Sequence, residues 1–181
     1  MITVISGTNR KASESLLFAQ QFVAFLQANS DEVVKLLSLD AIAHDWFHPD
    51  MYEKGQQSPS LRDLQDEYIL AADKFLIVSP EYNYGMPGPL KNALDWASRP
   101  YGKAALIGKP TLVISSSPAF TGGVRAQEQI HGTLLAIGAK LLGGPQIVIG
   151  AVADKVADGK LVDRASLDFA AAAVRRLVEI G

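Results

Sequence analysis

The fold of this chain follows from the stretch MITVISGTNRKASESLLFAQQFVAFL, residues 1–26. An apolar run at 1–6 is followed by a polar segment at 7–13, and from Glu14 to Ala28 apolar residues recur at helical spacing. Continuous aliphatic runs without alternation are typical of parallel strands that are covered on both faces. The stretch therefore predicts a buried strand, a polar loop and an amphipathic helix, which together form the first unit of an alternating α/β fold.

Similar units recur along the chain. Further strands are predicted at 33–37, 74–79, 112–114 and 147–149, and further helices near 61–72, 89–97, 123–138 and 163–179. This alternation predicts an α/β fold in which a doubly wound parallel sheet of five strands carries helices on both faces. Residues 40–60 are irregular and aromatic. We interpret them as a long excursion from the sheet that either covers a ligand or touches a neighbouring subunit.

The composition fits one globular domain over residues 1–181. Lys and Arg number 17 against 19 Asp and Glu, and the net charge of −2 argues against nucleic acid as a partner. The chain has no cysteine, which excludes thiolate catalysis and fits a reducing compartment. No apolar run is long enough to span a membrane, and the N-terminus lacks the pattern of a signal peptide. We therefore expect a cytoplasmic protein with no membrane partner.

Three loops are expected to carry the chemistry, because ligands of open α/β sheets bind beyond the carboxyl ends of the strands. The first is SGTNRKASES at 6–15, and the second is SPEYNYGMPGP at 79–89. The third is SSSP at 115–118, followed by TGGVR at 121–125. All three are rich in small, hydroxyl-bearing or turn-forming residues, and we expect them to meet at one edge of the sheet.

The first loop suits a phosphate group. Thr8, Ser13 and Ser15 offer hydroxyl donors, Arg10 offers a guanidinium, and the following helix offers free N–H groups and its dipole. The loop lacks both G-x-x-x-x-G-K-[ST] and G-x-G-x-x-G, which disfavours a nucleoside triphosphate and a standard dinucleotide site. A monophosphate remains. The alternative is that Ser13 only caps the helix.

The other two loops suit a flat heterocycle. Backbone N–H groups and the Asn83 amide stand beside the aromatic rings of Tyr82 and Tyr84. The alternative is an ordinary Pro/Gly turn with surface tyrosines. In the third loop, Ser116 and Ser117 offer donors, and the Gly122–Gly123 pair permits a close approach of backbone to a ligand.

In this order, the motifs GTNRKAS at 7–13, PEYNYGMPGPLKNALDW at 80–96 and GGVRAQ at 122–127 resemble the NADPH-dependent FMN reductase family. That family is a flavodoxin-like group that includes bacterial quinone and chromate reductases. The resemblance covers nearly the whole chain and is weakest at 40–60 and after about residue 150. It implies a flavodoxin-like sheet of order 2-1-3-4-5 and a homodimer or homotetramer built partly from residues 80–96.

The resemblance also implies the cofactor-binding residues. Those for the FMN phosphate would be Thr8, Arg10, Ser13 and Ser15. Those lining the ribityl chain and the isoalloxazine would be Pro80, Glu81, Tyr82 and Asn83, with Ser116 and Ser117 at the ring edge. Gly122, where the backbone can approach a ligand closely, is also expected to bind the cofactor. Family members often carry Ser at position 8 and Asn at position 15, where this chain has Thr8 and Ser15.

The implied function is an oxidoreductase that passes hydride from NADPH or NADH through FMN to a quinone, a dye or another small acceptor. FMN carries this chemistry itself, so no catalytic side chain is expected. We expect Arg125 or Lys103 to assist the phosphates of the pyridine nucleotide. The alternatives are a flavodoxin-like electron carrier, which the modest net charge disfavours, and an FMN-binding regulatory protein without turnover.

Two other enzyme classes fit the sequence poorly. His44 and His48 have a spacing that could hold a metal on a helix, but Pro49 follows directly and no third His-rich segment is present, so no metal is expected. A serine hydrolase would need the nucleophile elbow G-x-S-x-G, which the chain lacks.

Overall fold

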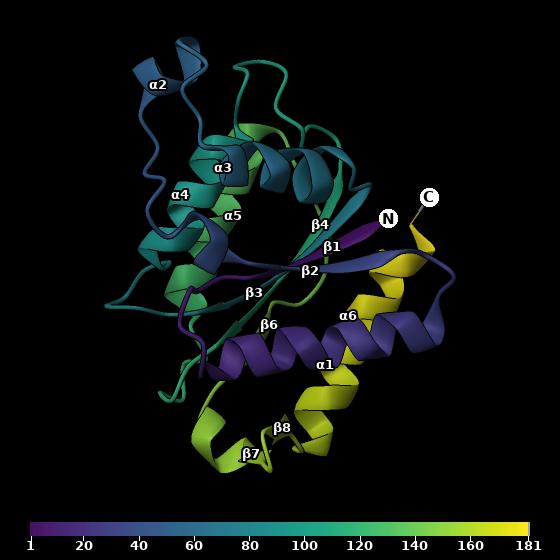
Figure 1. Ribbon diagram of the computed structural model, residues 1–181. Coiled ribbons are helices and arrows are strands. Elements are labelled where there is room, and N and C mark those ends of the chain that lie inside the picture. Colours follow the sequence, from purple (N-terminus) through teal and green to yellow (C-terminus); the bar gives the residue numbers. More distant parts are fainter. Residues whose placement is uncertain (181) are drawn as a thin grey trace.

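The computed structural model describes residues 1–180 and contains a six-stranded sheet (Figure 1). Its strands are β1 (Ile2–Ser6), β2 (Val34–Ser38), β3 (Lys74–Pro80), β4 (Pro110–Ser116), β5 (Lys140–Leu141) and β6 (Ile147–Ile149). The order is β2-β1-β3-β4-β5, β6 also pairs with β4, and every pair runs parallel. The doubly wound α/β fold and its strand order are confirmed.

The fifth position of the sheet is shared by two short strands. The start of β4 pairs with β5, and the end of β4 pairs with β6. Gly143, Gly144 and Pro145 separate the two, and Gly144 has a φ of 127°. Glycine and proline interrupt strands, so the edge is broken here. The sequence predicted only the β6 half, which is why five strands were expected rather than six.

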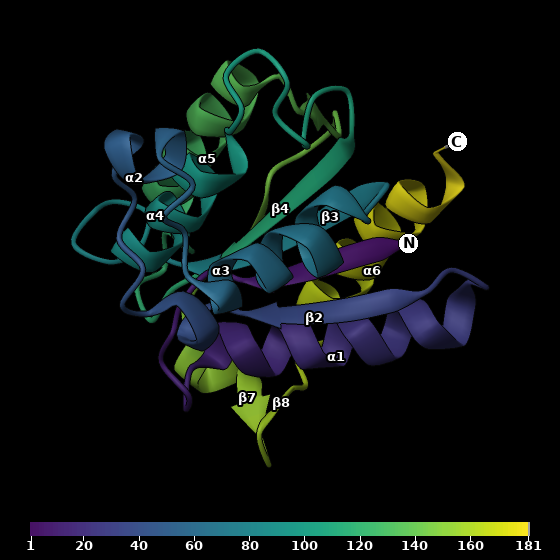
Figure 2. The same ribbon diagram turned by 45° about the horizontal axis from the view of Figure 1, so that its top comes forward.

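Helices cover both faces of the sheet (Figures 1 and 2). One face carries α1 (Glu14–Asn29) and α6 (Arg164–Glu179), and the other carries α3 (Pro59–Leu64), α4 (Gly88–Ala97) and α5 (Val124–Ile137). Each face has its own apolar core. Phe18 and Leu26 of α1 belong to one, and Leu90 and Trp96 of α4 belong to the other.

Smaller elements complete the chain. They are η1 (Leu39–Ile42), α2 (Pro49–Glu53), η2 (Gln65–Leu70), η3 (Val152–Lys155), β7 (Val156–Ala157) and β8 (Lys160–Leu161). The helix predicted near 61–72 is α3 followed by η2, which has the wider π-helical turn. Among residues 1–180, no helix combines the length and the apolarity needed to cross a bilayer.

The excursion at 40–60 is partly helical, since it contains the end of η1 and all of α2. Two side chains of α4 fasten its middle. The Asn92 amide accepts from the Phe47 N–H at 2.7 Å and donates to the Asp45 carbonyl at 2.9 Å, and Trp96 Nε1 donates to the same carbonyl at 2.8 Å. Phe47 also packs edge-on against the Trp96 ring. Beyond this anchor, α2 stands away from the sheet (Figure 1).

We expect Trp96→Ala to lower the free energy of unfolding by about 3–5 kcal/mol, because a buried aromatic side chain is lost and a cavity remains. Trp96 is 1% exposed, whereas Trp46 is 62% exposed. Urea unfolding followed by far-UV circular dichroism checks this, with Trp46→Ala as the matched control. Equal losses in the two variants would contradict the packing role of Trp96.

Candidate functional site

The three loops meet at one edge of the sheet, as the sequence predicted. Strand β3 lies between β1 and β4, and the ends of the strands are in register, with Ser6 opposite Val78 and Pro80 opposite Ser116. The loop after β1 lies directly against β3: a Cβ atom on Gly7 would come within 2.6 Å of Ser79 Oγ. Glycine is therefore required at position 7 for the loops to approach.

The first loop ends in a capped helix. Ser13 is the N-cap of α1, and its hydroxyl oxygen accepts from the Leu16 N–H at 3.1 Å and from the Ser15 hydroxyl at 3.3 Å. The capping contact considered above is therefore present. Because Ser13 Oγ accepts both bonds, its own proton stays available to a ligand.

Other donors in this loop are also free. The N–H groups of Asn9, Lys11 and Ala12 form no hydrogen bond within residues 1–180. Thr8 is buried and Arg10 is exposed, and the Arg10 guanidinium has no ion-pair partner in the described chain. The loop therefore presents backbone donors, hydroxyl groups and one unpaired cation beside the start of a helix, which is the donor set of a phosphate site.

The second loop is a preformed tight turn. Tyr82 and Gly85 exchange two backbone hydrogen bonds of 2.9 and 3.0 Å, and the residues between them are left-handed, with φ of 47° at Asn83 and 67° at Tyr84. Asparagine tolerates this conformation, whereas a tyrosine there is uncommon and strained. The Tyr82 hydroxyl lies 2.8 Å from Thr8 Oγ1, so the first two loops are joined directly.

Glu81 connects the second loop to α5. Its carboxylate accepts from the N–H groups of Arg125 at 3.1 Å and Ala126 at 3.2 Å. It also lies 3.6 Å from the Arg125 guanidinium, which stacks on the Tyr84 ring at 4.3 Å. The side chain of Glu81, expected to line a ligand, is thus turned toward the helix.

The third loop is held against β6. Ser117 N–H donates to the Ile149 carbonyl at 3.1 Å, and the Ser117 hydroxyl accepts from Ala119 N–H at 3.2 Å. A Cβ atom on Gly122 would lie 2.9 Å from Val148 Cβ, so the close approach at this glycine is to β6. Ser116 is 2% exposed, and its hydroxyl bonds to no residue among 1–180.

Lys103 is at the wrong place for the role expected of it. It follows α4 and precedes β4, so it lies at the amino-terminal edge of the sheet, opposite the three loops. Arg125 is at the correct edge. His44 and His48 flank the anchored part of the excursion, and no group of three or more metal-ligating side chains occurs within residues 1–180.

Sequence reasoning missed Gln129 and Thr121. Gln129 Oε1 accepts from Met86 N–H at 3.0 Å and so supports the second loop from α5, but a single polar residue on a helix gives no signal of this. Thr121 Oγ1 is buried without a partner in the described chain, and it belongs to the third loop. The Gly122–Gly123 pair marks this segment as a candidate ligand-binding loop, but it gives no sign that the Thr121 hydroxyl is buried there.

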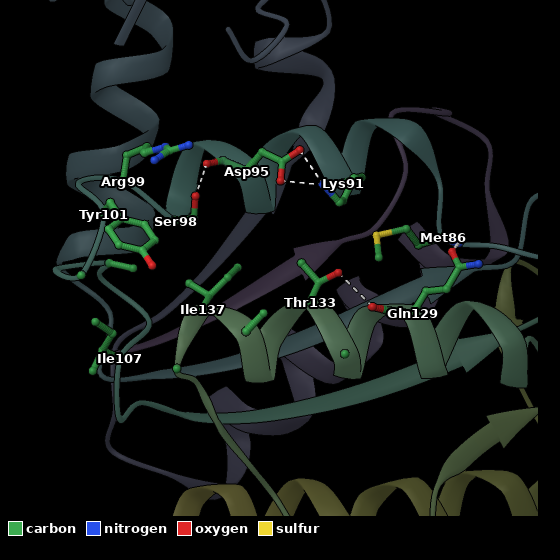
Figure 3. Close-up of a pocket in the computed structure, with 15 residues that line it drawn as sticks. Met86, Lys91, Asp95, Ser98, Arg99, Tyr101, Ile107, Gln129, Thr133 and Ile137 are labelled. Atoms are coloured by element: carbon green, nitrogen blue, oxygen red, sulfur yellow. Dashed lines mark hydrogen bonds and ion pairs between the residues drawn. The ribbon is translucent and has the colours of Figure 1, made fainter. Parts of the chain in front are cut away.

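A groove of about 950 Å³ lies between α4 and α5 (Figure 3). Its lining is mainly apolar at one end, with Ile107 and Ile137, and it reaches Met86 and Gln129 at the other. It therefore runs along the helices, away from the first and third loops, and touches the second loop at Met86.

Comparison with known proteins decides the family. The family model described as NADPH-dependent FMN reductase matches residues 1–154. The chain belongs to this family. The resemblance seen in the motifs is confirmed, and the chain is an oxidoreductase that uses FMN and NAD(P)H.

Individual relatives agree with this assignment. A quinone reductase of Pseudomonas putida is 42% identical over 90% of this chain and 85% of its own length. A quinone reductase of Escherichia coli is 31% identical over 92% of this chain and 87% of its own length. Among solved structures, the flavoenzyme FerB of Paracoccus denitrificans, an NAD(P)H:acceptor oxidoreductase, is 29% identical with a TM-score of 0.77, covering 98% of this chain and 94% of FerB.

The strand ends fit an FMN cofactor. A phosphate needs donors and positive charge, which the free N–H groups, the Ser13 hydroxyl and Arg10 provide. A polar ring edge needs hydrogen-bonding groups, and Thr121 Oγ1, which is buried without a partner among residues 1–180, belongs to the same loop as Ser117. The residues present therefore match both ends of the cofactor.

We expect the contact between Thr8 and Tyr82 to couple the two loops. In a double-mutant cycle of Thr8→Val and Tyr82→Phe, the coupling free energy should be about 0.5–1.5 kcal/mol, the usual value of a net hydrogen bond. Urea unfolding of the four proteins without added FMN measures it. Additive losses would show that the two hydroxyls do not interact in solution.

Proposed function

We propose that this chain is an NAD(P)H:quinone oxidoreductase that acts as one FMN-binding domain over residues 1–181. One NAD(P)H, one proton and one quinone give one NAD(P)⁺ and one hydroquinone. The observation that carries the proposal is the convergence of three loops at the carboxyl edge of the sheet, where Arg10 supplies a cation that has no ion-pair partner among residues 1–180. The quinone reductases among the relatives support the class of acceptor.

The first loop holds the FMN phosphate in this proposal. Arg10 pairs with the phosphate, Ser13 donates its free hydroxyl proton, and Thr8 supports both the loop and the neighbouring Tyr82. Ser15 contributes after its hydroxyl turns away from Ser13, its partner in the structure. The buried position of Thr8, Ser13 and Ser15 fits a dry phosphate pocket, in which such bonds are strong.

The second and third loops hold the remainder of the cofactor. Pro80, Glu81, Tyr82 and Asn83 line the ribityl chain and the ring through their backbone and through the Tyr82 and Asn83 side chains. Ser116, Ser117 and Gly122 border the ring edge, where the Ser116 hydroxyl has no other partner within residues 1–180.

Hydride transfer from NAD(P)H and delivery of the two electrons to the acceptor is the chemistry that FMN would supply when bound. The residues of the chain itself bind and orient the cofactor and the substrates. The rigid turn at 82–85 keeps Tyr82 and Tyr84 in fixed positions, with exposed fractions of 39% and 69%. Aromatic faces of this kind suit stacking of a nicotinamide or a quinone ring. The comparisons give no support to the alternatives of an electron carrier or a regulatory protein.

The proposal includes a homodimer or homotetramer in the cytoplasm. The groove between α4 and α5 (Figure 3) is the surface we assign to a second copy, since it adjoins residues 80–96 and has a mainly apolar lining. Burial lowers the pKa of the half-buried His131 on α5. The absence of cysteine suits a reducing compartment.

The purified protein is expected to be yellow and to lose its flavin absorption band rapidly when NADPH or NADH is added without oxygen. Adding a benzoquinone should then restore the band, because the acceptor removes the electrons. A visible spectrophotometer under anaerobic conditions suffices. A protein that retains FMN but is not bleached by either nucleotide would overturn the reductase proposal.

Arg10→Ala should weaken FMN binding by about tenfold or more, since a hydrogen bond to a charged group contributes about 1.5–3 kcal/mol. Fluorescence titration of the FMN-free protein with FMN measures the dissociation constant. Lys11→Ala is the matched control, because Lys11 is exposed and its nearest carboxylate, Asp40, lies 3.9 Å away. Equal FMN affinity in Arg10→Ala and the wild type would remove Arg10 from the phosphate site.

A further inference from the structure

Glu81 caps a helix from outside it. The N-cap residue of α5 is Gly123, which has no side chain to accept the first N–H groups. The Glu81 carboxylate takes this place from the neighbouring loop, accepting from Arg125 and Ala126, and its side chain is 9% exposed. A buried carboxylate at a helix N-terminus balances the positive end of the helix dipole.

The same carboxylate also offsets the positive charge of the Arg125 guanidinium. A cation in the first turn of a helix is disfavoured by the dipole, and Arg125 occupies that turn. Glu81 Oε1 lies 3.6 Å from its guanidinium, and the Tyr84 ring covers the guanidinium at 4.3 Å. Arg125 is 44% exposed, so it reaches the surface with its charge paired and with Tyr84 against it.

This paired charge adjoins Tyr84, a ring that the proposed function offers to the acceptor for stacking. Tyr84 is 69% exposed at the tip of the second loop, and its ring lies against the Arg125 guanidinium. The other cation at this edge, Arg10, is assigned above to the FMN phosphate. An incoming acceptor therefore meets an ion pair of zero net charge and an aromatic ring, rather than a free guanidinium.

We propose that Glu81, by holding Arg125 in an ion pair, selects uncharged acceptors such as quinones over anionic ones. The proposal rests on the proposed function and names its substrate class. Glu81 acts here as a specificity-determining residue through Arg125. Removing the carboxylate charge frees a cation beside the acceptor path, and removing the guanidinium leaves a free anion there.

The test compares naphthoquinone with its sulfonate, which share a ring and differ by one negative charge. The measured quantity is the ratio of kcat/KM for the sulfonate to kcat/KM for the parent quinone. Glu81→Gln should raise this ratio at low ionic strength by a factor between about 2, the effect of one unit charge at roughly 8 Å in bulk water, and about 30, its effect at the lower dielectric constant near a protein surface. Arg125→Gln should lower it about as much, and about 0.5 M salt should shrink both changes.

Two controls separate charge from structure. The double variant Glu81→Gln/Arg125→Gln should return the ratio to the wild-type value, because the freed cation is gone. Glu179→Gln removes the same charge from the last turn of α6, where the residue is exposed, and should leave the ratio unchanged. A merely structural role of Glu81 would lower both rates together and leave the ratio as it was.

The outcomes distinguish the two proposals. A wild-type protein that reduces neither quinone contradicts the proposed function. A wild-type protein that reduces quinone, with the same ratio in Glu81→Gln, contradicts the inference alone. If Glu81→Gln does not fold, Arg125→Gln provides the test instead. A lower ratio of sulfonate to quinone in Arg125→Gln supports the inference, and an unchanged ratio overturns it.

Discussion

The parallel pairing of β3 between β1 and β4 is the constraint on which the site depends. Because all three strands run in one direction, their carboxyl ends lie at one edge, and three loops far apart in the sequence become neighbours. Gly7 allows the first of them to lie against Ser79. A side chain at position 7 would push the first loop from the second and separate Thr8 from Tyr82.

Most of the fold could be predicted from the sequence, because buried parallel strands and amphipathic helices leave strong patterns. The first four strands and the long helices lie close to their expected positions. The predictions failed where a pattern is short or depends on a partner. Lys140–Leu141 is too short to show a strand pattern, and the π-helical turn of η2 does not differ in its apolar spacing from an ordinary helix.

The candidate site, like the fold, could be predicted from the sequence only in part. Its position and residue types follow from loops at strand ends, but the direction of a side chain does not. Glu81 stands in a motif that suggests a ligand, yet its carboxylate bonds to α5, because Gly123 leaves that helix without a cap. Gly122 similarly serves the packing on β6. Lys103 was grouped with Arg125 by charge alone, and only the course of the chain after α4 separates the two.

The two arginines at the strand ends differ in how their charges are balanced. The first and second loops of the site therefore differ in how strongly they attract an anion. Arg10 has no acidic partner in the described chain and lies beside free backbone donors, which suits a ligand with a permanent negative charge. Arg125 has a carboxylate and an aromatic ring against it, so its charge is already paired. An anion is therefore held more strongly at the first loop than at the second. In the function proposed above, this difference favours an FMN phosphate at Arg10, and it leaves the exposed Tyr84 ring as a stacking surface for a flat, uncharged molecule.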